Sequence, residues 1–180
     1  MSNTLLESVV KKNRARLIPF MLALYVLAFL DRSNIGFAKE TYQLDTGLSN
    51  EAYALGAGIF FVVYAFLGVP ANLLMRKFGA RKWIGCTTLL WGILSAAMAW
   101  ADTEAKFLLV RTLLGAAEAG FFPGMIYLTS QWFPQQNRAS IMGLFYMGAP
   151  LALTLGSPLS GALLEMHGFM GHPGWFWMFI

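Results

Sequence analysis

Long apolar stretches alternate with short polar segments along the whole chain. A helix of about 20 mainly apolar residues crosses the roughly 30 Å of bilayer hydrocarbon, because each residue adds about 1.5 Å. Five stretches meet this length, and a sixth opens at Trp175. The pattern therefore predicts an all-α, polytopic membrane helix bundle with five complete spans and the start of a sixth. The predicted spans cover residues 17–38, 52–75, 83–101, 107–133, 139–164 and, for the sixth, 175–180.

The composition agrees with a membrane protein. The 180 residues are 57% hydrophobic and only 12% charged, whereas about 25% of the residues in soluble domains are charged. A single cysteine, Cys86, excludes a disulfide framework within the chain and a cysteine-based zinc cluster. The net charge of +4 would suit nucleic acid only if the basic residues formed a patch on a soluble domain. The expected surroundings are therefore a lipid bilayer, and no nucleic-acid partner is expected.

Lysine and arginine fall mainly on one side of the predicted spans. Nine lie before the first span, after the second or after the fourth, and two lie on the opposite side. Basic loops remain in the cytoplasm, so the count predicts a cytoplasmic N-terminus, residues 1–16, followed by a membrane bundle, residues 17–180. The nine are Lys11, Lys12, Arg14, Arg16, Arg76, Lys77, Arg81, Lys82 and Arg138, and the two are Lys39 and Lys106.

Glycine and proline interrupt several predicted spans. The fourth contains Pro123, and the fifth contains Gly148, Pro150 and Pro158 among other small residues. In a membrane bundle, neighbouring helices satisfy the backbone groups that proline leaves free, and small residues permit close helix packing. The fifth span is therefore predicted to be bent and tightly packed.

Four charged residues lie inside the predicted spans: Asp31, Arg32, Arg111 and Glu118. A charge near the bilayer centre costs about 2.5 to 3.5 kcal/mol, so these side chains are expected to face one another, water or a ligand. The helical rise places Arg32 roughly 9 Å and Arg111 roughly 6 Å from the outer ends of their spans. Two guanidinium groups at a similar depth suit a carboxylate, to which each donates paired hydrogen bonds. An organic anion is the predicted ligand.

Glu118 is the charged residue that lies nearest to the middle of its span. It follows Arg111 by two helical turns and lies roughly 10 Å deeper. No basic residue lies within one turn of it on the same helix. Because burial favours the uncharged form of a carboxyl group, Glu118 is a candidate proton carrier.

Polar uncharged residues in the spans are candidates for binding a polyhydroxylated substrate. Asn34 and Tyr64 are the main candidates, and Tyr25 and Tyr127 are further ones. For each tyrosine, packing or anchoring at the membrane interface is the more common role.

A purely structural role for the intramembrane charges is the alternative. Arg111 lies near enough to the membrane surface for its side chain to reach water. Asp31 and Arg32 are adjacent, so they could form an ion pair that only fixes helix packing.

Three motifs carry a resemblance to a known family: LDRSNIG at residues 30–36, RTLLGAAEAGFFPG at residues 111–124 and KFGARK at residues 77–82. With them, the chain resembles the N-terminal half of a major facilitator superfamily transporter, and more narrowly the anion:cation symporter family of sugar-acid and organic-anion permeases. The resemblance extends from Lys11 to Ile180. It implies twelve spans in two six-helix halves, alternating access to a site between the halves, and a C-terminal half as the missing partner.

The resemblance also implies roles for individual residues. Arg32, Arg111 and Tyr64 match positions near the substrate, and Asp31 and Glu118 match acidic positions associated with proton coupling. It implies import of a sugar acid such as L-rhamnonate by proton symport across the bacterial inner membrane, with no cofactor and no bound metal.

One loop departs from the superfamily pattern. The loop between the second and third spans commonly reads D-R-x-G-x-R, whereas residues 76–81 here read RKFGAR, so Arg76 replaces the aspartate. The conformational latch that uses this carboxylate is therefore in doubt. The simpler interpretation is a basic cytoplasmic loop that fixes topology.

Two other classes of protein stay open at this point. A membrane-integral enzyme would use the buried polar residues in catalysis, although H-E-x-x-H, G-x-S-x-G and phosphate-loop motifs are absent from the sequence. A receptor or assembly subunit that does not transport would use the charges to bind a partner helix. His167 and His172 lie in a loop without the spacing of a metal motif.

Overall fold

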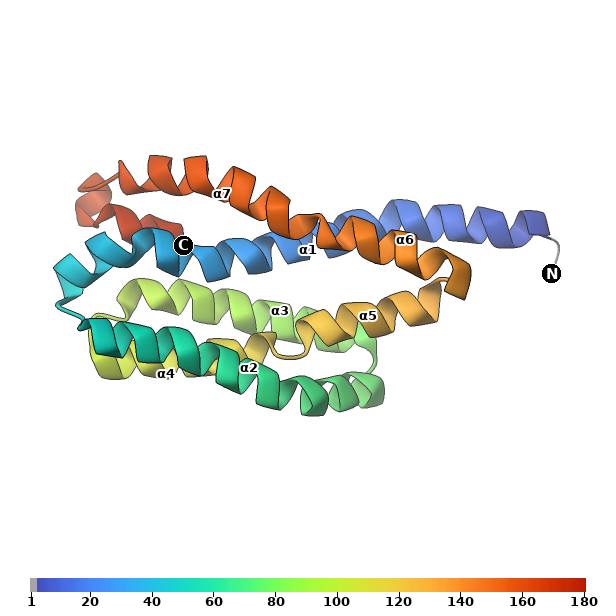
Figure 1. Cartoon of the computed structure of the whole chain (residues 1–180), viewed down its shortest axis with the longest axis horizontal. Coiled ribbons are helices and arrows are strands. Elements are labelled where there is room, and N and C mark those ends of the chain that lie inside the picture. Colours follow the sequence, from blue (N-terminus) through green and yellow to red (C-terminus); the bar gives the residue numbers. More distant parts are fainter. Residues whose placement is uncertain (1–2) are drawn as a thin grey trace.

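Five membrane-length helical spans run side by side with alternating direction in the computed structural model, which describes residues 3–180 and the side chains of residues 7–180 (Figure 1). Only helices and their connections occur in the described residues. The predicted all-α bundle with five spans is confirmed. The N-terminus, the α2–α3 connection and the α5–α6 connection lie at the same end of the bundle, so the segments that carry most of the basic residues are together (Figure 1).

The helices have the following bounds. The first three spans are α1 (Asn3–Thr46), α2 (Asn50–Phe78) and α3 (Ala80–Ala97), which the 3₁₀ helix η1 (Met98–Trp100) extends. The fourth consists of α4 (Glu104–Glu118) and α5 (Phe121–Trp132), and the fifth of α6 (Gln135–Tyr146) and α7 (Gly148–Leu164). Two 3₁₀ helices follow, η2 (Phe169–Gly171) and η3 (Gly174–Met178). From residue 3, the segment predicted as a cytoplasmic N-terminus continues into the first span without a break.

Proline produces the breaks within the fourth and fifth spans. Pro123 has no N–H to donate to the carbonyl of Ala119, and α4 accordingly ends at Glu118. Pro150 acts in the same way in the fifth span, where α6 and α7 separate at Met147. The bend expected in the fifth span is therefore present, and the fourth span has a comparable one.

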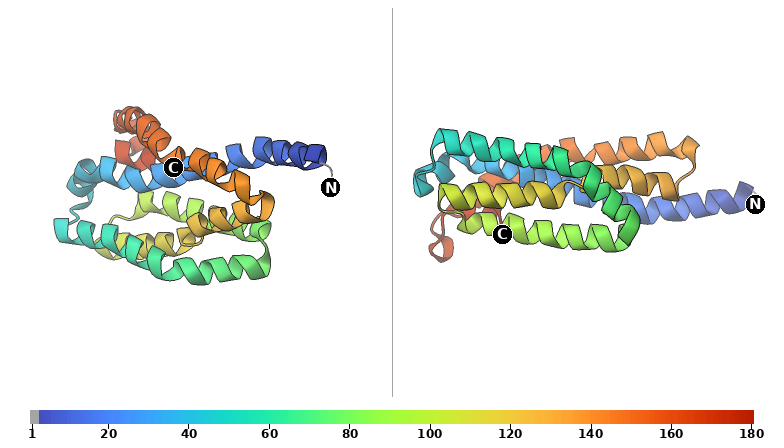
Figure 2. Two further views of the ribbon diagram at one scale, coloured as in Figure 1. Left: turned by 45° about the vertical axis from the view of Figure 1, so that its right-hand side comes forward. Right: turned by 90° about the horizontal axis from the view of Figure 1, so that it is seen from below.

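Two pairs of helices form most of the bundle. In one pair α2 packs along α4, in the other α1 packs along α7, and α3 lies against α4 and α5 (Figure 2). The contact between α2 and α4 is close because α4 carries a glycine there: a Cβ atom on Gly115 would lie 2.5 Å from the Phe60 carbonyl oxygen. Close approach of the two backbones holds the charged residues of α4 against α2.

Gly115→Ala is expected to destabilise the protein. The added methyl group has no room beside the α2 backbone, and overpacking of this kind costs about 1 to 3 kcal/mol. Thermal unfolding of the full-length protein in detergent measures the effect. Gly58→Ala, in α2, is the matched control, because a Cβ atom there meets no atom within 4 Å. Equal melting temperatures for the two variants would contradict the close approach.

The bundle end opposite the N-terminus is fixed by contacts with η3. Trp175 donates a hydrogen bond from Nε1 to Oδ2 of Asp45 at 2.8 Å, and its ring meets Tyr42 edge-on with centroids 4.7 Å apart. On the first turn of α4, Lys106 donates to Asp102 of the preceding loop at 2.6 Å, which holds the pKa of that carboxyl below its usual range. The contacts of Trp175 with Asp45 and Tyr42 join η3 to α1 at this end of the bundle.

Candidate substrate site

Arg32 and Glu118 form an ion pair between α1 and α4. Arg32 donates from Nε to Oε2 of Glu118 at 2.9 Å, and its Nη2 lies 2.7 Å from the same oxygen. The Glu118 side chain is fully buried and that of Arg32 is 18% exposed. Helical side chains tilt toward the N-terminus of their own helix. Since α1 and α4 run in opposite directions, the two groups lean toward each other from different depths.

Arg111 is a buried cation without an anionic partner. The residue is only 2% exposed, and its Nε donates to the carbonyl of Gly56 at 3.3 Å. Among residues 7–180, no carboxylate lies within 4.0 Å of its guanidinium group. Removing a charge from water is costly unless a partner compensates. Among the described residues, the charge of Arg111 is therefore compensated by no direct ion pair.

An aromatic wall on α2 holds the two arginines near each other. The Cζ atoms of Arg32 and Arg111 lie 5.5 Å and 4.5 Å from the ring centroid of Phe60. Tyr64, one turn further along α2, lies 4.7 Å from Cζ of Arg32 and stacks on Phe60. Both guanidinium groups therefore lie against one aromatic ring, Arg111 on the side of Gly56 and Arg32 on the side of Tyr64.

Asp31 contacts α3. Its Oδ1 accepts a hydrogen bond from Oγ of Ser95 in α3. Among the described side chains, Oδ2 of Asp31 and Oε1 of Glu118 are buried oxygens without a hydrogen-bond donor. A proton on either group would supply a missing donor.

The two contacts that a purely structural role required are absent from the described residues. Arg32 pairs with Glu118 rather than with Asp31, because adjacent residues on a helix point about 100° apart. Arg111 does not extend to the membrane surface, since it is almost completely buried among α2 and α4. Neither contact considered under that alternative is formed, and both arginines face the interior of the bundle.

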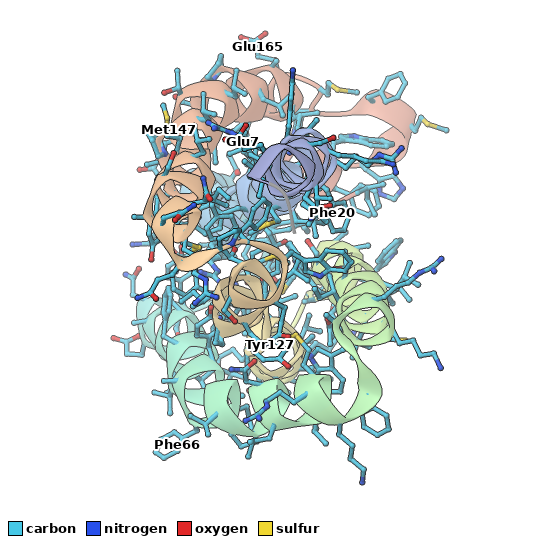
Figure 3. The ribbon with its side chains drawn as sticks, turned by 90° about the vertical axis from the view of Figure 1, so that its right-hand side faces the viewer. Glu7, Phe20, Phe66, Tyr127, Met147 and Glu165 are labelled. Carbon is cyan, nitrogen blue, oxygen red and sulfur yellow. The ribbon has the colours of Figure 1, made fainter. Side chains whose placement is uncertain are left out.

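The other polar candidates have different surroundings. Asn34 donates to the carbonyl of Met178 at 2.7 Å, in the groove between α1 and α3, so the structure does not bring it to Arg111. Tyr25 stacks on Phe145 in the core, with centroids 4.3 Å apart. Tyr127 lies inside the bundle on α5 (Figure 3). A role for Asn34 in substrate binding stays a prediction.

Two residues of the site were not anticipated from the sequence. Ser95 lies in an uncharged span, and a lone serine gives no signal of a carboxylate partner. Phe60 carries a weak signal, because Gly56, Phe60 and Tyr64 recur at every fourth position of α2 and so share one face. That face is the one against which both arginines lie.

Comparison with known proteins identifies the family. The Major Facilitator Superfamily model matches residues 21–180, and the chain belongs to this superfamily of membrane transporters, which are not enzymes. The chain is 92% identical over all of its 180 residues to the inner membrane transport protein RhmT of Escherichia coli strain K12. It is 51% identical, over 99% of its length, to a candidate tartrate transporter of Agrobacterium vitis. It covers 42% and 40% of these two relatives, so the chain spans about two fifths of their length.

A solved structure has the same fold. A bacterial homolog of the human lysosomal transporter Spinster, in an inward-facing and occupied conformation, superposes with a TM-score of 0.84 at 21% sequence identity. The match covers 92% of this chain and 40% of that one. The five-span bundle is therefore the N-terminal part of a transporter fold, as the sequence predicted.

Proposed function

We propose that the full-length protein imports an organic anion, a sugar acid such as L-rhamnonate, together with protons by alternating access. The observation that carries the proposal is the buried cation of Arg111, which has no carboxylate within 4.0 Å in the described chain and lies with Arg32 against the ring of Phe60. Two guanidinium groups provide the planar hydrogen-bond donors that suit a carboxylate. The tartrate named for one relative is also a hydroxylated carboxylate.

Proton coupling follows from competition for Arg32. While Glu118 is ionised it occupies Arg32. When Glu118 takes up a proton, Arg32 loses its counter-ion and can join Arg111 in holding the carboxylate of the substrate. Proton and anion therefore favour each other's binding, as linkage requires. When the proton leaves, Glu118 recovers Arg32 and the anion is released. Asp31 supplies a second acidic group beside this pair.

The remaining assignments extend the same proposal. Tyr64 borders Arg32 and would hydrogen-bond the hydroxylated part of the substrate, with Asn34 as a further candidate. The distribution of lysine and arginine supports a cytoplasmic N-terminus in the bacterial inner membrane. The C-terminal half of the transporter would complete the site and, with this bundle, alternate its exposure.

A competition uptake panel tests this function. Vesicles that contain the full-length protein, with an imposed pH gradient, should accumulate labelled L-rhamnonate. Unlabelled aldonates and aldarates should compete, whereas the neutral sugar L-rhamnose should not, because it has no carboxylate. A protonophore should abolish accumulation. Equal competition by the neutral sugar would contradict the anion site, and binding without uptake would favour a receptor instead.

A further inference from the structure

A cavity beside the charged cluster has a mainly apolar lining that contains a few polar groups. Its volume is about 330 Å³, at the lower end of the roughly 300 to 1,000 Å³ of small-molecule sites. It lies between α2 and the break that separates α4 from α5. The lining residues that matter here are Tyr64, Gly68, Asn72, Arg76 and Ala119.

Both walls of the cavity begin at the charged cluster. On α2 the first lining residue is Tyr64, whose ring lies 4.7 Å from Cζ of Arg32. On the opposite wall Ala119 follows Glu118 directly in the chain.

Four of the α2 residues that line the cavity form a row. Tyr64, Gly68, Asn72 and Arg76 occupy every fourth position, which places them along one ridge of the helix. At about 1.5 Å per residue, the row extends roughly 18 Å from the cluster toward the bundle end with the basic loops. Arg76 lies at the basic end of this row, and its Cζ atom is 6.0 Å from the ring centroid of Tyr127 on α5.

The cavity contains polar groups that lack partners. Oδ1 of Asn72 is buried and has no hydrogen-bond donor among the described residues. The carbonyl of Ala119 has lost its helical partner, since position 123 is a proline without an N–H group. Both oxygens could accept hydrogen bonds from hydroxyl groups of a ligand, and Arg76 could bind its carboxylate.

We propose that this cavity is a second binding subsite for the hydroxylated carboxylate substrate, which occupies it between the charged cluster and the basic end of the bundle. The proposal rests on the function proposed above. It also gives a physical reason for Arg76 at the loop position where the superfamily commonly has aspartate. The aspartate common there would repel an anion in this cavity, whereas Arg76 attracts it.

Gly68 keeps the subsite open at its middle. A Cβ atom at this position would lie 3.5 Å from the carbonyl oxygen of Ala119. This is an ordinary van der Waals distance, so Gly68→Ala should fold normally. The methyl group would nevertheless occupy space beside one of the unpaired acceptors.

Sided exchange by the full-length protein, reconstituted in one orientation in proteoliposomes, tests the subsite. Labelled L-rhamnonate is supplied on either side, and KM is measured for each side. Asn72→Leu removes the amide at similar volume, and Gly68→Ala narrows the cavity. Each is expected to raise KM on the side of the basic loops by about tenfold, while KM on the opposite side changes by less than about twofold.

Two pairs of variants control for indirect effects. Gly58→Ala adds the same methyl group to α2 where a Cβ atom meets nothing within 4 Å. Arg76→Gln and Lys77→Gln each remove one cation from the same loop, but only Arg76 lines the cavity. We expect Arg76→Gln to raise KM on the basic side, and Lys77→Gln and Gly58→Ala to leave it unchanged.

The outcomes separate the subsite from the proposed function. The subsite alone would be overturned if the wild-type protein exchanged substrate but Asn72→Leu and Gly68→Ala changed KM equally on both sides. It would also be overturned if these variants changed KM on neither side. Equal effects of Arg76→Gln and Lys77→Gln would also overturn it, because they would indicate a general effect of loop charge. Failure of the wild-type protein to exchange any aldonate or aldarate would overturn the proposed function, and the subsite with it.

Discussion

Arg111→Ala is expected to lower kcat/KM for anion uptake by about 100-fold or more. Arg111 is 2% exposed, and no carboxylate in the described chain lies within 4.0 Å of it. In the proposed function this charge binds the carboxylate of the substrate, and loss of one partner of a buried charge contact costs about 2 to 5 kcal/mol. Initial uptake rates over a range of L-rhamnonate concentrations, measured with the full-length protein, give the effect.

Two further variants define what Arg111 contributes. Arg111→Lys keeps the charge but loses the planar pair of donors, so a loss of about tenfold is expected. Lys106→Ala, on the first turn of the same helix, removes an exposed cation paired with Asp102 and should change uptake by less than about twofold. Normal affinity and uptake in Arg111→Ala would show that this guanidinium group does not bind the carboxylate.

Glu118→Gln is expected to abolish proton-driven accumulation and to retain exchange of substrate across the membrane. Glutamine keeps the size of the side chain but carries no charge and takes up no proton. Arg32 would then be available to the anion at every pH, so substrate affinity should lose its dependence on pH. In vesicles with a pH gradient, the ratio of internal to external substrate should fall to about 1, because no proton enters with the anion.

The control for this prediction is Glu104→Gln, at the start of α4. Glu104 accepts a hydrogen bond from Ser49 near the end of the bundle and lies outside the charged cluster. The Glu104→Gln variant should leave accumulation unchanged. Full accumulation in Glu118→Gln would remove Glu118 from the coupling role. Loss of exchange together with accumulation would point instead to a structural role, in which Arg32 needs the carboxylate for folding.

The sequence predicted the parts of the fold that depend on local properties of the chain. Span number follows from apolar length, and the break at Met147 follows from Pro150, which cannot donate a backbone hydrogen bond. The similar depth expected for Arg32 and Arg111 uses only the helical rise. Each of these inferences needs only one helix at a time.

The contacts between helices could not be predicted in the same way. The partner of Arg32 lies 86 residues away, whereas Asp31 is its neighbour in the chain. Several spans are apolar on all sides, so periodicity does not show which face of a helix meets which neighbour. For this reason the pairing of Asp31 with Ser95, and the contact of both arginines with Phe60, became visible only in the folded bundle.

The ion pair between Arg32 and Glu118 also has a consequence for synthesis at the ribosome. At about 5 to 20 residues per second, the 86 residues between the two partners take roughly 4 to 17 seconds to translate. The first helix is complete well before its partner is made, and its arginine must stay in contact with water or with the insertion machinery during that time. The first helix therefore reaches its final packed position late in assembly, after the fourth span has been made.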